Sequence, residues 1–296
     1  MGGTWMKRIL LGLFCVLLSG VAMAGGSSAV RKSVQASMLV TGTIEVAPDG
    51  SVAKYAFDHP EKLPPAVTDL LAKAVPVWRF EPIKFDGKPV IAKTPMGLRV
   101  VAKPLNDGNY SINVAGAWFG NYVGDEKNIP SEMITHKRTV QPIYPRDAVN
   151  ARVSGTVYVL MKVGRDGLVA DAVAEQVDLR VIGSDSQLTL WRKVLADAAL
   201  HALKQDTFNP PTLGKAVDRP YWVTRIPVDF SLVGPDAPAA VRGEVYGQWR
   251  PYLPGPVQTP TWVSGYALPG SADAVPEGGA LLTDTSLNLL TPLGSG

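Results

Sequence analysis

The chain has 296 residues, a hydrophobic content of 46% and a formal net charge of +3. This length allows about two domains of roughly 100–200 residues each, and the hydrophobic content excludes a chain that is disordered throughout. The small net charge does not indicate the strongly basic surface that is typical of nucleic-acid-binding proteins, so we expect no nucleic-acid partner. Cys15 is the only cysteine, which excludes an intramolecular disulfide.

The first 24 residues have the pattern of a secretory signal peptide. Lys7 and Arg8 form a short positive region, and a mostly apolar run follows from Ile9 to Val21. Ala22-Met23-Ala24 is an A-x-A cleavage site, and the run is shorter than the ~20 residues that a spanning helix needs. We therefore expect a cleaved leader over residues 1–24, with a retained membrane anchor as the alternative.

A β-hairpin is expected near the start of the secreted chain. Apolar and polar residues alternate from Val40 to Val46, and a second strand begins at Val52. Pro48-Asp49-Gly50 between them is a turn signal, because Pro presets φ and Gly accepts a positive φ.

A short helix and a further strand follow this hairpin. An apolar stripe at helical spacing predicts a helix over Pro64 to Val75, and strand signals resume from Val90 to Ala102 after a turn at Asp86-Gly87. Residues 104–138 are rich in Gly, Asn, Asp and Pro with weak periodicity, which predicts a linker. We expect the aromatic residues of this linker to tether it locally, with a ligand platform as the alternative. They are Tyr110, Trp118, Phe119 and Tyr122.

The stretch from Val140 to Val173 predicts an extended entry followed by an antiparallel hairpin. Pro142 and Pro145 fix φ and favour extended conformations for the residues that precede them. Residues 157–163 then alternate as in a strand with one face in a core, and Asp166-Gly167 supplies the turn. The expected core-facing residues are Val157, Val159, Met161 and Val163, and those facing the other way are Tyr158, Leu160 and Lys162.

The rest of the chain contains a long helix, a long strand and a tail. Leu188 to Lys204 carries the clearest apolar stripe at helical spacing. Tyr221 to Val233 is a strand candidate, and Pro227 within it favours an edge strand or a bulge. Residues 234–296 are rich in Pro, Gly, Ser and Thr, which favours an extended or partly disordered tail.

The two halves of the chain share a series of landmarks in the same order. Both have a D-G turn, a helix, an F-x-P segment and a G-K pair. The matching segments are Val46 to Val52 with Val163 to Val169, Ala66 to Val75 with Val194 to Leu203, Arg79 to Pro82 with Thr207 to Pro210, and Gly87 to Val90 with Gly214 to Val217. This order predicts two copies of one β-β-α-β unit.

The second copy carries an ordered set of motifs, each weak alone but specific together. The set is Pro142-Ile143-Tyr144-Pro145-Arg146-Asp147-Ala148, Gly155-Thr156-Val157-Tyr158-Val159, Asp166-Gly167, Ala198-Ala199, Phe208-Asn209-Pro210, Gly214-Lys215 and Pro227-Val228-Asp229-Phe230. It resembles the C-terminal domain of TonB-type energy transducers over residues 139–233. The first copy keeps the D-G, F-x-P and G-K motifs over residues 37–103 but lacks Y-P, like a diverged copy.

The resemblance implies an α+β fold, with two tandem TonB-C-like β-β-α-β domains and small antiparallel sheets. It also implies a periplasmic protein that binds a short extended segment of outer-membrane TonB-dependent transporters by strand addition, in support of energised transport. The positions here that match the partner-binding region are Gln141, Pro142, Tyr144, Pro145, Val223, Arg225, Val228 and Phe230. The competing hypothesis for Tyr144 and the prolines is that they only set the entry geometry of the fold.

Two departures from the family pattern bear on this function. The leader is of the cleavable type, and no Pro/Lys/Glu spacer repeat is present in the sequence. The alternative is therefore a structural or scaffolding envelope module that does not transduce energy, and that forms a homodimer or binds other periplasmic proteins.

Signals for catalysis and for cofactors are missing from the sequence. His59, His136 and His201 share no metal-ligand spacing, and no G-x-S-x-G, H-E-x-x-H or phosphate loop occurs. We therefore expect no enzyme activity, no metal site and no cofactor.

Overall fold

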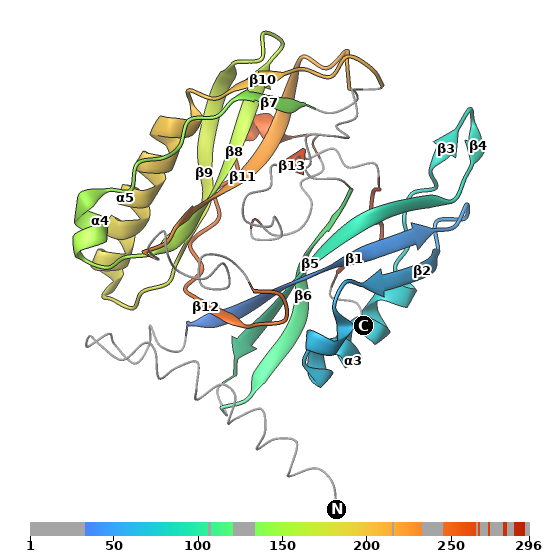
Figure 1. Ribbon diagram of the computed structural model, residues 1–296, viewed down its shortest axis with the longest axis horizontal. Helices are drawn as coiled ribbons and strands as arrows, with labels where there is room; N and C mark the ends of the chain where they lie inside the picture. Colours follow the sequence, from blue (N-terminus) through green and yellow to red (C-terminus); the bar gives the residue numbers. More distant parts are fainter. Residues whose placement is uncertain are drawn as a thin grey trace, which may run out of the picture.

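The computed structural model describes residues 33–105, 108–120, 134–214, 216–232, 245–264, 266, 272, 281–282 and 287–293. These residues form two units, each with an antiparallel sheet and a helix (Figure 1). The predicted α+β class with small antiparallel sheets is therefore confirmed. The predicted leader lies outside the described residues.

The first unit has the predicted hairpin, helix and strand. Strand β1 pairs with β2 on one side and β5 on the other, and β5 pairs with β6. Helix α3 buries Val67 and Leu71 in a core with Val40 and Leu98 of the sheet. The elements are β1 (Gln35–Val46), β2 (Val52–Phe57), η1 (Pro60–Lys62), α3 (Pro65–Ala74), η2 (Val75–Val77), β3 (Lys84–Phe85), β4 (Lys88–Pro89), β5 (Ala92–Pro104) and β6 (Tyr110–Phe119).

Strand β6 corrects the prediction of a linker over residues 104–138. Residues 110–119 form a strand that pairs with β5 along its length, and Trp118 and Phe119 are buried. Its first residues alternate from Tyr110 to Val114, but its end is buried at consecutive positions from Ala117 to Phe119, so alternation marks only half of the strand. Tyr122 of the same aromatic set lies outside the described residues.

The second unit repeats this order, with a longer helix. Its sheet has the order β13-β11-β8-β9, in which β13 is Leu281–Leu282, and β7 pairs separately with β10. Helix α5 begins with a capping box, in which Ser184 accepts from the Gln187 backbone N–H and the Gln187 side chain accepts from the Ser184 backbone N–H. The elements are β7 (Thr135–Arg138), α4 (Arg146–Asn150), β8 (Gly155–Gly164), β9 (Val169–Leu179), α5 (Asp185–Leu203), β10 (Thr207–Asn209) and β11 (Tyr221–Phe230).

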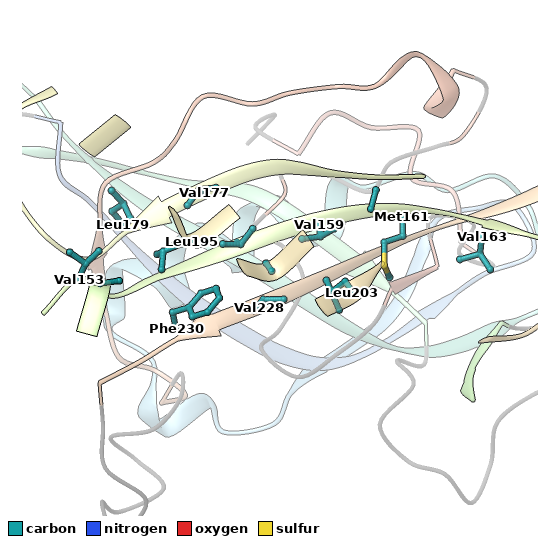
Figure 2. Close-up of a cluster of buried hydrophobic side chains, with 14 of the residues drawn as sticks. Val153, Val159, Met161, Val163, Val177, Leu179, Leu195, Leu203, Val228 and Phe230 are labelled. Atoms are coloured by element: carbon teal, nitrogen blue, oxygen red, sulfur yellow. The ribbon is translucent and has the colours of Figure 1, made fainter. Parts of the chain in front are cut away.

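The core of the second unit lies between α5 and one face of its sheet (Figure 2). The residues predicted to face this core in β8 all do so, and Leu195 and Leu203 of α5 pack against them. Val228 and Phe230 of β11 complete the layer. The apolar face predicted from the alternation of β8 and the apolar stripe predicted for α5 thus pack into one core.

The C-terminal region is an integral part of both units. We define the strap as residues 245–264, which include β12 (Arg250–Tyr252) and η3 (Thr261–Val263). Strand β12 pairs with the start of β1, and the next residue, Leu253, exchanges backbone hydrogen bonds of 3.0 and 2.7 Å with Leu179 of β9. The strap therefore connects the two sheets through backbone hydrogen bonds (Figure 1).

The strap also covers the outer face of the second sheet, the face opposite α5. Val263 packs there on Leu160 and Val223, and both are fully buried. The prediction that β8 has only one face in a core is therefore wrong, because the strap adds a second apolar layer.

The last described residues return to the first unit. Glu81 N–H donates to the Asn288 carbonyl at 2.9 Å, and Leu290 N–H donates to the Arg79 carbonyl at 2.8 Å. Leu287 is buried in the first core. The described parts of residues 234–296 are thus packed rather than free, because scattered Trp and Leu residues anchor a segment whose Pro and Gly hide any periodicity.

The D-G turns of the two units make the same backbone contact. Phe80 N–H donates to the Gly50 carbonyl at 2.8 Å, and Phe208 N–H donates to the Gly167 carbonyl at 2.8 Å. Both glycines have a positive φ, +82° and +77°. This shared geometry agrees with the repeat inferred from sequence, while the assignment of the first unit as a diverged copy stays a prediction.

Candidate functional site

Strand β11 supplies the candidate site, because one of its two sides is only partly paired. It pairs with β8 along its whole length from Tyr221 to Phe230. On the other side, β13 (Leu281–Leu282) pairs only with Thr224 and Arg225. Among the described residues, no strand lies beside Ile226–Phe230 on this side. A strand edge of this kind offers backbone N–H and C=O groups to an added strand.

Pro227 lies within this unpaired part of β11. A proline has no N–H to donate to a ladder, so sheets tolerate it at edges rather than in central strands. Among the described residues, no strand pairs with Pro227 on this side, and its position at an edge or a bulge stays a prediction.

The Q-P-I-Y-P entry ends beside the same half of β11. The Tyr144 hydroxyl donates to the Val153 carbonyl at 2.5 Å, and its ring packs against Phe230 with centroids 5.3 Å apart. Burial raises the pKa of the Tyr144 phenol, which keeps it protonated as a donor. Pro145 occupies the N-cap position of α4. Tyr144 and Pro145 thus fix the entry of the chain into the fold, as the structural hypothesis for them requires.

The entry also presents side chains to solvent. Gln141 is exposed, and Ile143 is 84% exposed, the most exposed of the large apolar side chains that the structure describes. Pro142 is partly exposed. Tyr144, which follows them, contacts the Phe230 ring on the core face of β11.

The side chains of the predicted β11 residues point elsewhere. Val228 and Phe230 belong to the core under α5, and Val223 lies beneath the strap. Arg225 is buried with Glu175 on the outer face, with Nε–Oε2 and Nη2–Oε1 distances of 2.6 and 2.7 Å. Their side chains are therefore unavailable to a partner in this structure, and only the backbone of β11 can serve one.

A charged cluster at the end of β11 was not predicted from sequence. The Asp229 carboxylate lies 2.6 Å from the Arg180 guanidinium and 3.7 Å from that of Arg250 in the strap. Thr156 also donates to Asp229 at 2.9 Å. The alternation of β11 placed Asp229 opposite the core, but nothing in the sequence indicated which arginines would meet it.

The entry segment is held at its other end by a buried carboxylate. Val140 N–H donates to Asp206 Oδ1 at 2.7 Å, and burial raises the pKa of this carboxyl. His136 packs on Phe208 nearby, and burial lowers the pKa of its imidazole. Among the described residues, no group of three or more His, Cys, Asp and Glu side chains could hold a metal ion.

Comparison with known families decides what the second unit is. Residues 140–232 match the model of the Gram-negative bacterial TonB protein C-terminal family. This segment is a TonB C-terminal domain. The family is a non-enzymatic protein-interaction domain of envelope proteins, and it includes domains that interact with outer-membrane transporters.

The match leaves the rest of the chain unassigned, because it covers less than half of the sequence. No curated protein and no solved structure matches the chain. No helix among the described residues is long and apolar enough to cross a membrane.

Proposed function

We propose that the protein is a periplasmic, TonB-like binding protein that engages outer-membrane TonB-dependent transporters by strand addition, in support of energised transport. The observation that carries the proposal is the open half of β11, from Ile226 to Phe230, in a domain of the TonB C-terminal family. An extended peptide added there would gain main-chain hydrogen bonds from β11. The exposed or partly exposed side chains of Gln141, Pro142 and Ile143 would supply further contacts to the partner.

Short strand β13 occupies the same side of β11 at Thr224 and Arg225. A partner strand that is longer than the open half would therefore compete with β13 for these two residues. The proposal consequently includes a partner that pairs first beside Phe230 and then extends toward Arg225.

Site-specific photo-cross-linking tests the proposal. A benzophenone amino acid at Ser231, next to the open half of β11, is expected to cross-link to the N-terminal periplasmic segment of a TonB-dependent transporter in envelope preparations. The matched control carries the same amino acid at Leu190, which is exposed on α5 of the same domain. Mass spectrometry of the cross-linked peptide identifies the partner and the segment.

The same experiment separates the alternative function. Cross-links from position 231 to a second copy of this chain, or only to periplasmic proteins other than transporters, would support a scaffolding module and contradict the proposal. Equal cross-linking from positions 231 and 190 would also contradict it, because it would show no preference for β11.

A further inference from the structure

The β3–β4 hairpin of the first unit projects away from the body of the molecule (Figure 1). Its turn, Asp86-Gly87, has positive φ values of 50° and 76°, as in a tight Asp-Gly hairpin turn. A Cβ built on Gly87 would have no neighbouring atom within 4 Å. The tip of the hairpin therefore lies clear of the rest of the described chain.

Exposed apolar side chains lie on this hairpin and just after it. Phe85 is 71% exposed, more than any other aromatic side chain among the described residues, and Ile91 is 66% exposed. Exposing an aromatic ring of this size to water forgoes the stabilisation that burial would give it. The hairpin consequently presents apolar surface that its own fold does not use.

Two lysines flank the exposed ring. Lys84 and Lys88 are both exposed, and neither makes an ion pair with a residue that the structure describes. Lys93, at the base of the hairpin, instead pairs with Glu45 at 3.2 Å. Asp86 is the one carboxylate in the turn, so the segment 84–89 keeps a net positive charge.

The register places a lysine on each face of the hairpin. Phe85 lies opposite Lys88, and Lys84 lies opposite Pro89. Residues opposite one another share a face, and successive residues alternate, so each face carries one lysine and one apolar residue. A flat protein partner would contact only one of these faces. A lipid interface surrounds the tip and offers anionic groups beside an apolar interior to both faces.

We propose that the β3–β4 hairpin inserts its tip into the headgroup region of an anionic phospholipid membrane. Phe85 would enter the apolar boundary, while the long stems of Lys84 and Lys88 would let their ammonium groups reach lipid phosphates. One aromatic side chain and two lysines give weak and reversible binding that falls with salt. This inference rests on the first unit alone and does not depend on transporter binding.

Vesicle co-sedimentation tests the inference. The probes are vesicles of phosphatidylcholine alone and of phosphatidylcholine with about 30% phosphatidylglycerol, which carry the charge that lysines recognise. The protein is the chain from Gly25, which keeps every residue that the structure describes. We expect binding to the anionic vesicles only, with a loss of binding when NaCl rises from about 0.05 to 0.5 M.

Three hairpin variants have different expected effects. Phe85→Ser should lower the partition coefficient about tenfold because the apolar contact is lost. The double variant K84E/K88E should lower it by at least about tenfold because two attractive charges are reversed. Asp86→Asn should raise it several-fold, since it removes the repelling carboxylate, and Asn-Gly is as favourable as Asp-Gly in this turn.

The charge control is K62E/K73E, which changes the net charge equally at two exposed positions outside the hairpin. It should bind like the parent chain, and circular dichroism and thermal unfolding should show all variants folded. Equal binding to both kinds of vesicle would overturn the inference. So would a loss in K62E/K73E as large as in K84E/K88E, or no gain in Asp86→Asn.

Discussion

The Arg225–Glu175 pair is a residue-level feature that should be costly to disturb. Both side chains are nearly inaccessible, at 1% and 4% exposure, and two short hydrogen bonds join them. Arg225→Met would leave the Glu175 carboxylate buried without its partner, which costs about 3–5 kcal/mol of stability. Urea unfolding should show this loss, and the double variant R225M/E175M should recover much of it.

A surface pair provides the comparison for this prediction. Lys193 and Asp197 are one helical turn apart and mostly exposed on α5. Lys193→Met should change the unfolding free energy by less than about 1 kcal/mol, because water screens such pairs. Similar costs for Arg225→Met and Lys193→Met would show that the buried pair is not held as the structure places it.

His136 gives the second domain a pH dependence at the same scale. Burial lowers its pKa in the folded state below the ordinary value of 6.5. At a pH above the pKa of His136 in the unfolded state, the imidazole is neutral in both the folded and the unfolded state, and its protonation costs the folded state no stability. As pH falls below about 6.5, the unfolded state gains a proton that the folded state resists, and stability is lost. Thermal unfolding between about pH 8 and pH 5 should therefore show a falling midpoint that becomes flatter in His136→Asn.

At the scale of elements, the D-G turns illustrate how contact rather than φ decides the cost of a substitution. Gly50 and Gly87 have similar positive φ values, but a Cβ on Gly50 would lie 2.1 Å from the Phe80 carbonyl oxygen. Gly50→Ala must therefore displace the F-x-P segment as well as strain the backbone. We expect it to cost at least about 3 kcal/mol, against about 1 kcal/mol for Gly87→Ala. Equal losses in chemical denaturation would contradict the docking of this turn.

At the scale of the whole molecule, the strap decides whether the two units behave as one body. It pairs with β1 of the first sheet and with Leu179 of the second, and it covers Leu160 and Val223. A chain that ends after Leu232 lacks the strap, β13 and residues 287–293, and should expose this apolar face and edges of β1, β9 and β11. We expect it to bind a hydrophobic dye and to self-associate, as measured by light scattering after gel filtration.

Two strap valines serve as a milder test of the same idea. Val263 is buried on the second sheet, whereas Val257 is 62% exposed. Val263→Ser should accelerate proteolysis within the strap, and Val257→Ser should leave it unchanged. Equal protease sensitivity in both variants would mean that the strap is not docked through Val263.

Local sequence patterns were sufficient to predict most elements of the second unit and its family. Alternation in β8, the apolar stripe of α5 and the D-G turn each depend on residues close in the chain, so they could be recognised without coordinates. The ordered motifs from Pro142 to Phe230 added the family, which the match over residues 140–232 confirmed. Pro227 predicted an edge strand or a bulge, because a missing N–H is a property of the residue, and the family resemblance added the partner-binding edge.

Contacts between distant residues were decided only by the tertiary structure. Strand β6 was missed although Tyr110 to Val114 alternate between apolar and polar residues, because this run is short and the buried end of the strand lacks alternation. Nothing near Val223 and Arg225 showed that they would be covered, since Val263 of the strap and Glu175 of β9 come from elsewhere in the chain. The sequence by itself therefore determined β8, β9, α5, β11 and the family of the second unit. The tertiary structure decided which described strands pair and which side chains are covered, because long-range pairing and burial depend on segments that no local pattern connects.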